Sequence, residues 1–227
     1  MIVEKRVILL NKNWSFSRAE ENGMTAPEQV CIPHSVKLTP ANSSGCRNFQ
    51  GVCKYLKSIF VPHEYKGKKL VLRFEGAMGK SALYINGNEV SRHFCGYTPF
   101  VTDITDNVNY GEENEIAITL DNSDDPLIPP GKPQDGLDFS YDGGLYRSVT
   151  LTVCEPLYIT DPILANEVGG GGIFVWYTDV SESSAAVHIR AHIKNEYPEM
   201  KNYSAVIAII SPDGKKIAGT GLNSRLN

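Results

Sequence analysis

The sequence lacks three features that mark common classes of protein. No apolar stretch approaches the roughly 18 residues that a membrane-spanning helix needs. No run of basic residues interrupts a chain whose formal net charge is −4, so nucleic acid and membrane surfaces are poor candidate partners. No repeat at solenoid or propeller period occurs, and no low-complexity segment is longer than the four glycines at 169–172.

Cysteine is scarce and irregularly spaced, which argues against two further classes. An odd number of cysteines without a CxxC pair disfavours both a complete disulfide framework and a cysteine-rich zinc site. Cys46 and Cys53 could pair, and the alternative is that the cysteines are small, buried apolar side chains. The five cysteines are Cys31, Cys46, Cys53, Cys95 and Cys154.

The first residues of the chain do not resemble a targeting signal. Its first residues, MIVEKRVILLNKNW, alternate like a strand and lack the charged start, apolar centre and cleavage site of a secretory signal. The localisation is therefore open: the protein is cytoplasmic, or periplasmic or extracellular if a signal peptide has been removed. The redox state of the cysteines stays open with it.

What the sequence has instead is a succession of short alternating runs. Leu70, Leu72 and Phe74 alternate with polar and apolar neighbours and share one face of a strand. Asn86-Gly87 stands between two apolar runs, which is a strong hairpin signal because a type I′ turn needs positive φ at both central residues. Such runs predict an antiparallel, all-β fold.

Four blocks in fixed order carry a resemblance to a known family. FEGA, LYINGNEV, HFCGYTPFVTDIT and GEENEIAITLDN lie between residues 74 and 122. They closely resemble the sugar-binding jelly-roll domain that opens glycoside hydrolase family 2 enzymes, which are β-galactosidases, β-glucuronidases and β-mannosidases. The later run DGLDFSYDGGLYRSV resembles the family's D-x-x-x-x-G-G-I-Y-R-D-V. Cys95 and Ser148 depart from the family pattern, where a glycine and an aspartate are usual.

A composition shift near Cys154-Glu155-Pro156 predicts a domain boundary. Residues 1–154 are expected to form an antiparallel jelly-roll, galactose-binding-like β-sandwich. Beyond it, short strands at roughly ten-residue spacing suggest an immunoglobulin-like β-sandwich, which the family places at this position. Residues 155–227 fall short of the ~100 residues that such a sandwich needs, so we expect this second domain to be partial and truncated.

The resemblance implies a chemistry that this chain does not complete. Retaining glycosidases cleave with two carboxylates, and in the family both are glutamates on a TIM barrel that follows the immunoglobulin-like domain. That barrel would need roughly 250 further residues. The chain is therefore expected to contain no catalytic residue and to be inactive alone, while its parent is expected to be a β-galactosidase-like glycoside hydrolase.

Two residues are expected to touch the sugar. In the family's β-galactosidases an acid before the glycine pair reaches into the barrel's active site, and Asp138 stands at the matching distance before Gly143-Gly144. An asparagine in an Asn-x-x-Gly pattern joins it, and the run from Asn48 to Gly51 reproduces that pattern. Carboxylates and amides suit sugars because they hydrogen-bond adjacent hydroxyls. Each residue also has a purely structural alternative as a turn residue.

Two other classes of function stay open beside the enzyme fragment. The jelly roll is also the fold of free-standing lectin-like domains, so the chain could be an autonomous carbohydrate-binding module. It could equally be a structural or adhesive β-sandwich, and a β-glucuronidase or β-mannosidase fragment is an alternative within the family.

The expected partners are a β-galactoside-like carbohydrate and the chain's own C-terminal TIM barrel, with homo-oligomer formation left open. No cofactor is expected for this portion, and a metal ion in the barrel of the parent is left open. Several side chains that could suggest chemistry are expected to be structural. They are the loop residue His34, hydrogen-bonded to backbone; Asp103, capping a turn; Tyr97 and Phe100, in the core; and the pair His188 and His192.

Overall fold

The computed structural model describes residues 5–36, 49–137, 139, 141 and 143–226. These residues divide into two compact units, one covering Lys5–Val153 and the other beginning at Cys154. Strands dominate both units, and the only helices among the described residues are two short 3₁₀ helices, η1 (His63–Tyr65) and η2 (Gln134–Gly136). The predicted all-β class is confirmed. The predicted domain bounds, 1–154 and 155–227, stay a prediction.

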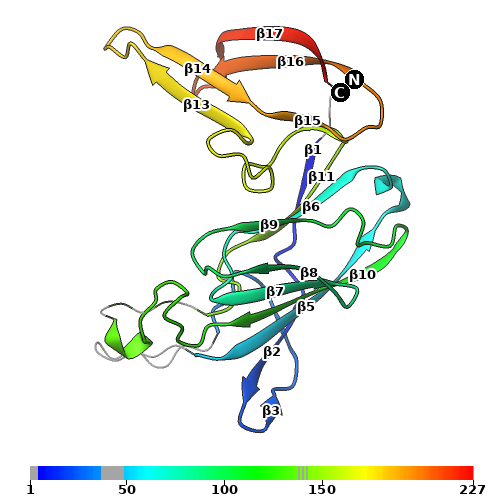
Figure 1. Cartoon of the computed structure of the whole chain (residues 1–227), viewed down its shortest axis with the longest axis vertical. Helices are drawn as coiled ribbons and strands as arrows, with labels where there is room; N and C mark the ends of the chain where they lie inside the picture. The colour runs from blue at the N-terminus through cyan, green and yellow to red at the C-terminus, as the bar shows by residue number, and fades with distance from the viewer. Residues whose placement is uncertain (1–4, 37–48, 138, 140, 142, 227) are drawn as a thin grey trace. The chain divides into compact units, whose positions relative to one another are not determined.

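The first unit contains two sheets that face each other (Figure 1). One has the strand order β1-β11-β6-β9, and the other has the order β3-β2-β5-β10-β7-β8, with β4 paired to β2. The first sheet consists of β1 (Lys5–Leu9), β6 (Lys69–Phe74), β9 (Phe100–Asp103) and β11 (Val149–Cys154). The second consists of β2 (Trp14–Glu20), β3 (Gly23–Met24), β4 (Glu28–Val30), β5 (Val52–Val61), β7 (Lys80–Ile85), β8 (Asn88–His93) and β10 (Glu112–Asp121).

The core of this unit comes from alternate residues of the strands. Leu70, Leu72 and Phe74 of β6 are fully buried, because the period of two places them on one face. Phe74 stacks on Phe100 of β9 with the ring centroids 4.7 Å apart, so the core position predicted for Phe100 is confirmed. The facing sheet contributes Trp14, Phe16, Tyr55, Leu83, Ile85, Ile116 and Ile118.

The hairpin predicted at Asn86-Gly87 is confirmed. Both residues have positive φ, 51° and 81°, and they join the antiparallel strands β7 and β8. The Asn86 amide donates to Oδ1 of Asn114 at 2.8 Å and accepts the backbone N–H of Glu115 at 3.0 Å. Asn114 is 1% exposed and also hydrogen-bonds the backbone of Asn109. The hairpin is thereby anchored to the start of β10.

The glycine pair returns a long connection to the core. This connection leads from β10 to β11, and η2 is the one helix or strand among its described residues. Gly144 has a φ of +87°, and a β-carbon there would collide with the Tyr55 hydroxyl and lie 2.9 Å from the His34 carbonyl oxygen. Only glycine therefore fits at position 144.

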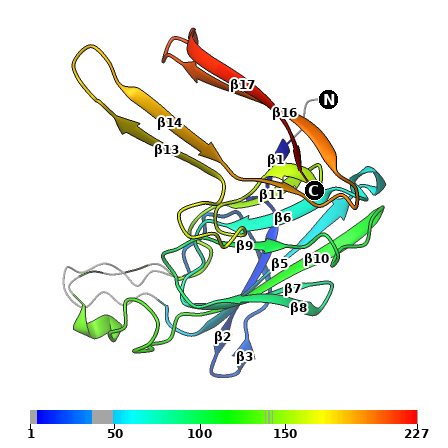
Figure 2. The same ribbon diagram turned by 45° about the horizontal axis from the view of Figure 1, so that its top comes forward.

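The second unit consists of three antiparallel strand pairs. They are β12 (Leu157–Ile159) with β15 (Ile193–Asn195), β13 (Ile173–Thr178) with β14 (Ala186–Ala191), and β16 (Lys201–Ile210) with β17 (Lys216–Leu226). The last two pairs are long hairpins (Figure 2). Leu157 and Tyr158 are buried, whereas Phe174, Val206 and Ile217 are 49%, 78% and 67% exposed. The part of the chain that is described contains no helix of the length and apolar character of a membrane span.

Candidate functional site

The two predicted sugar ligands, Asp138 and Asn48, lie outside the described residues, so their roles stay predictions. Residues close to each of them in the sequence are described. Gln50 follows Asn48 by two residues, Gln134 precedes Asp138 by four, and Tyr141 follows it by three. The described site is therefore built from these neighbours and from the end of β10, with which they make contact.

Asn122, directly after β10, fastens the first of these segments. Its side-chain amide donates to the carbonyl oxygen of Phe49 at 2.7 Å and accepts the backbone N–H of Gly51 at 2.9 Å. The backbone N–H of Asn122 donates to the carbonyl oxygen of Gly51 at 3.3 Å. Because Asn122 is 6% exposed, these bonds satisfy a buried amide. They hold 49–51 against the end of the strand.

Asp124 joins that segment to η2. Its Oδ1 accepts a hydrogen bond from the Gln50 side chain at 2.5 Å and another from the backbone N–H of Gln134 at 3.2 Å. Gln50 also donates to the Tyr141 hydroxyl at 3.4 Å. We call Gln50, Asn122, Asp124, Gln134 and Tyr141 the loop cluster. It brings together the chain neighbours of both predicted ligands.

The electrostatics of the loop cluster are set by burial and by one carboxylate. Burial raises the pKa of Tyr141, and the nearby negative charge of Asp124 raises it further. The Tyr141 hydroxyl therefore stays protonated at neutral pH. A protonated phenol and amides beside one carboxylate can hydrogen-bond neutral hydroxyl-bearing molecules.

Lys80 balances two neighbouring aspartates. Its ammonium lies 3.1 Å from a carboxylate oxygen of Asp125 and 3.7 Å from one of Asp121. Hydrogen bonding to Asp125 raises the pKa of Lys80. The backbone N–H of Leu127, followed by Lys80, lowers the pKa of Asp125. These charges are thus paired with each other, and Asp124 is the one acidic side chain of the loop cluster.

The space beside the loop cluster is small. A cavity of about 10 Å³ is bordered by Asn122, Asp124, Tyr141 and nearby loop residues, which is room for about one water molecule. Sites for small ligands usually enclose about 300–1,000 Å³. The described residues around the loop cluster therefore do not enclose a pocket large enough for a sugar.

Two larger hollows lie elsewhere, and neither has the environment of a glycosidase centre. One, of about 580 Å³, lies over the second sheet and includes Glu113 and Glu115. Both glutamates are exposed, and Glu113 accepts a hydrogen bond from Ser58 at 2.5 Å. Neither therefore lies in the buried, apolar setting in which a glycosidase keeps its acid.

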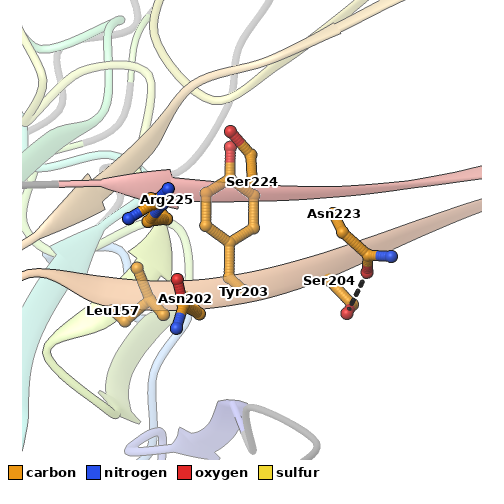
Figure 3. Close-up of a pocket in the computed structure, with 7 residues that line it drawn as sticks. All are labelled: Leu157, Asn202, Tyr203, Ser204, Asn223, Ser224 and Arg225. Atoms are coloured by element: carbon orange, nitrogen blue, oxygen red, sulfur yellow. Dashed lines mark hydrogen bonds between the residues drawn. The ribbon is translucent and has the colours of Figure 1, made fainter.

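The other hollow, of about 550 Å³, lies in the second unit (Figure 3). Its lining comes from β16 and β17 together with Leu157, and Arg225 is its one charged residue. A Ser204–Asn223 hydrogen bond of 2.5 Å occupies one end. Without a carboxylate, this lining does not suit acid–base catalysis of glycoside cleavage.

Most of the remaining candidates take the structural roles expected for them. Asp103 Oδ1 accepts the backbone N–H of Thr105 at 3.0 Å, so it caps a turn as predicted. His34 differs in detail, since its ring pairs with the Tyr55 hydroxyl at 2.8 Å rather than with backbone. The core position predicted for Tyr97 is wrong: Tyr97 is 38% exposed, because it lies in the turn before β9, and the strand begins only at Phe100.

His188 and His192 were considered as a possible metal-binding pair, and the cysteines as possible disulfide partners. His188 pairs with the Thr178 hydroxyl at 2.8 Å, and His192 pairs with that of Thr160 at 3.0 Å. Among the described residues, no group of three metal-binding side chains gathers. None of the four described cysteines forms a disulfide, and Cys53 and Cys154 are buried.

The sequence did not predict the loop cluster, although two of its members lie within the two motifs that carry the predicted ligands. Gln50 and Tyr141 lie inside the motif segments that were recognised, and Asn122 directly follows a predicted strand. Asp124 and Gln134 carried no signal, since a loop rich in Asp and Pro is typical of ordinary surface turns.

A family model and several relatives match this chain. The model of the sugar binding domain of glycosyl hydrolases family 2 matches residues 4–155. A β-glucuronidase of Formosa agariphila is 32% identical over 86% of the chain and 21% of its own length. A β-galactosidase of Thermoanaerobacter pseudethanolicus is 31% identical over 90% of the chain and 25% of its own length.

The structure is similar to solved enzymes as well. A β-glucuronidase from glycoside hydrolase family 2 matches all of the chain with a TM-score of 0.81 at 27% identity. Bacteroides uniformis β-glucuronidase 2 matches 98% of it with a TM-score of 0.80 at 25% identity. The chain spans about a quarter of each of these two structures. Because the family model covers well over half of the chain, the protein belongs to glycoside hydrolase family 2 and carries its sugar-binding domain.

Proposed function

We propose that the chain is the non-catalytic, sugar-contacting portion of a retaining β-galactosidase, which supports a catalytic TIM barrel and supplies Asp138 and Asn48 to the bound sugar. The observation that carries the proposal is the loop cluster. Its hydrogen bonds draw together the segments that flank these two residues along the chain, although the segments are about ninety residues apart.

The division of labour follows from the chemistry of the reaction. Cleavage with retention needs a nucleophilic carboxylate and an acid about 5–5.5 Å apart, and the barrel supplies both in this proposal. The chain contributes a carboxylate and an amide that hydrogen-bond adjacent hydroxyls of the sugar. Such contacts raise the rate only where they are stronger in the transition state than in the ground state.

A β-glucuronidase is the second candidate, since relatives of both names match the chain. The composition of the loop cluster favours a neutral sugar, because its one acidic side chain is Asp124 and it contains no basic side chain. A glucuronide would bring a second carboxylate toward it, and like charges in a partly desolvated site repel. The β-galactoside is therefore the substrate we propose first.

The first test is hydrolysis of a panel of aryl β-glycosides by the complete product of the gene that encodes this chain. We expect hydrolysis of the β-galactoside, and a loss of about 10²-fold or more in kcat/KM for Asp138→Ala, in the range reported for removing one strong contact to a transition state. Asp106→Ala is the matched control, because Asp106 is an exposed aspartate in a turn of the same unit. It should retain wild-type activity.

Two results would overturn parts of this proposal. Hydrolysis of the β-glucuronide in preference to the β-galactoside would replace the substrate, and an active enzyme indifferent to Asp138→Ala would remove that residue from the site. Titration of the isolated chain with galactose separates the enzyme portion from an autonomous carbohydrate-binding module. We expect weak or undetectable binding, since the cavity beside the loop cluster holds about 10 Å³. Micromolar affinity would favour the module.

A further inference from the structure

One side of the β13–β14 hairpin carries a row of aromatic and basic side chains. Among the described strands β13 and β14 pair only with each other, and their register places Phe174 opposite Arg190 and Trp176 opposite His188. Because side chains alternate along a strand, these four lie on the same side of the hairpin, and we call them the aromatic row. The opposite side carries Ile173, Val175, Tyr177, Val187 and Ile189.

Trp176 is the centre of the aromatic row. Its ring stacks on that of His188 with centroids 5.0 Å apart and an angle of 10° between the planes. The Phe174 ring lies 5.6 Å from it, and the Arg190 guanidinium carbon lies 5.7 Å from its centroid. Phe174 is nevertheless 49% exposed, and Arg190 is exposed as well. The row is therefore ordered by its own contacts and open to solvent.

The charge of Arg190 is not paired within the described part of the chain. Arg18, Arg73 and Arg92 each form an ion pair with a glutamate two or three residues away. Arg190 instead donates one hydrogen bond, of 3.4 Å, to the carbonyl oxygen of Gly169 and forms no ion pair with a described residue. A guanidinium has five N–H donors in a planar fork that matches a carboxylate. Most of these donors are available to a ligand.

The acidic residues of the hairpin do not compensate this charge. Asp179 and Glu182 lie in the connection between β13 and β14. Arg190 lies opposite Phe174, five residues before Asp179. At about 3.3 Å per residue this is roughly 16 Å along the strand, which exceeds the ~8 Å screening length at physiological ionic strength. A negative group beside the rings would therefore meet the arginine rather than these acids.

We propose that the aromatic row binds an acidic polysaccharide, one whose mainly neutral backbone carries occasional uronate groups. The C–H face of a pyranose packs on exposed aromatic rings, and the uronate carboxylate pairs with the fork of Arg190. One arginine matches one carboxylate, and the formal net charge of −4 on the chain disfavours a densely charged polymer.

An open row of rings also indicates the size of the ligand. Sites for small molecules are concave and enclose most of the ligand, whereas a polymer can lie along an exposed strand pair. This inference does not depend on the proposed function, because the aromatic row belongs to the second unit and the loop cluster to the first.

The first test is affinity electrophoresis of the complete gene product in native gels that contain glucuronoxylan. The matched ligand is the same polymer after chemical reduction of its carboxyl groups to alcohols. We expect glucuronoxylan to retard the wild type, and the reduced polymer to bind about 10-fold more weakly, as for the loss of a hydrogen-bonded charge pair. Arg190→Gln should bind both polymers at that weaker level. Arg225→Gln is the matched control, since Arg225 is an exposed arginine of β17 without an ion pair among the described residues.

The rings are tested by Trp176→Ala, which should weaken binding of both polymers by about 3- to 10-fold, since stacking does not need the carboxylate. Its control is Tyr177→Ala, which removes an aromatic side chain that is 61% exposed on the opposite side of the same strand. If either alanine variant does not fold, Trp176→Phe and Tyr177→Phe make the same comparison with smaller effects.

Tryptophan fluorescence of the 227-residue chain gives a direct reading of the site. Its two tryptophans are Trp14, which is 0% exposed, and Trp176, which is partly exposed. Glucuronoxylan should change the emission of the wild type, and Trp176→Phe should abolish the change.

Several results would overturn the inference. Absence of retardation removes the site, and equal retardation by the reduced polymer removes the acidic ligand. Retardation that is indifferent to both Arg190→Gln and Trp176→Ala places binding elsewhere on the protein. A chain that responds in fluorescence while the complete gene product is not retarded would show that this side of the hairpin is covered in the complete protein. Equal retardation by single-stranded DNA would replace the polysaccharide with nucleic acid.

Discussion

The two units are built from similar alternating strands and differ in what those strands pack against. In the first unit two sheets share a core, and large side chains such as Trp14, Tyr55 and Phe74 are fully buried. In the second unit the described strands form separate pairs, and Phe174, Val175 and Tyr177 of β13 are 49%, 42% and 61% exposed. Alternation in a sequence therefore predicts a strand, whereas burial depends on a second sheet.

The largest test of this comparison is a pair of phenylalanine truncations. Phe74→Ala empties a fully buried position of β6 and should lower the free energy of unfolding of the first unit by about 3–5 kcal/mol. Phe174→Ala removes a half-exposed ring from β13 and should cost the second unit less than about 1 kcal/mol. Urea unfolding followed by tryptophan fluorescence reports on both units, since Trp14 lies in one and Trp176 in the other. Equal losses would contradict the comparison.

Two glycines of similar φ, one in each unit, allow a second comparison with a smaller expected difference in stability. Gly144 and Gly214 have φ of +87° and +84°, but a β-carbon at Gly144 would collide with the Tyr55 hydroxyl, whereas one at Gly214 would meet nothing within 4 Å. Gly214→Ala should therefore cost about 1–2 kcal/mol from the left-handed backbone alone. Gly144→Ala adds a steric clash and should cost roughly 2–4 kcal/mol. Thermal unfolding of the two variants measures the difference, and similar shifts would mean that the core around Tyr55 yields.

The fold was predictable where local chemistry decides it. Asn86-Gly87 specifies its hairpin because few other residues adopt two positive φ angles in succession, and Leu70, Leu72 and Phe74 follow the period of two. The loop cluster was not predictable in this way, because Gln50 and Tyr141 are brought together by tertiary structure across 91 residues. The core position predicted for Tyr97 was wrong for a related reason. Outside a strand the alternation of side chains does not apply, so the sequence does not indicate whether an aromatic residue there points inward.

The smallest test concerns acid, and it again compares one residue from each unit. Burial alone would raise the pKa of Asp103, but hydrogen bonds from Lys69 and Thr105 outweigh it and hold the pKa below its ordinary value. A carboxyl with a lowered pKa stabilises the fold above the unfolded value, near 3.9, and that stabilisation is lost as the pH falls through the folded value. Asp103→Asn should therefore lose less stability than the wild type between pH 5 and about pH 3.

Asp213 is the control for this test, because its pKa is also lowered, chiefly by a hydrogen bond from Ser211, while its carboxylate is exposed in the turn of the β16–β17 hairpin. Water screens such an exposed group, so Asp213→Asn should leave the acid profile of the chain unchanged. Thermal midpoints measured at half-unit steps of pH compare the two variants. An acid profile that responds to Asp213→Asn but not to Asp103→Asn would mean that the second unit, rather than the buried core of the first, limits stability in acid.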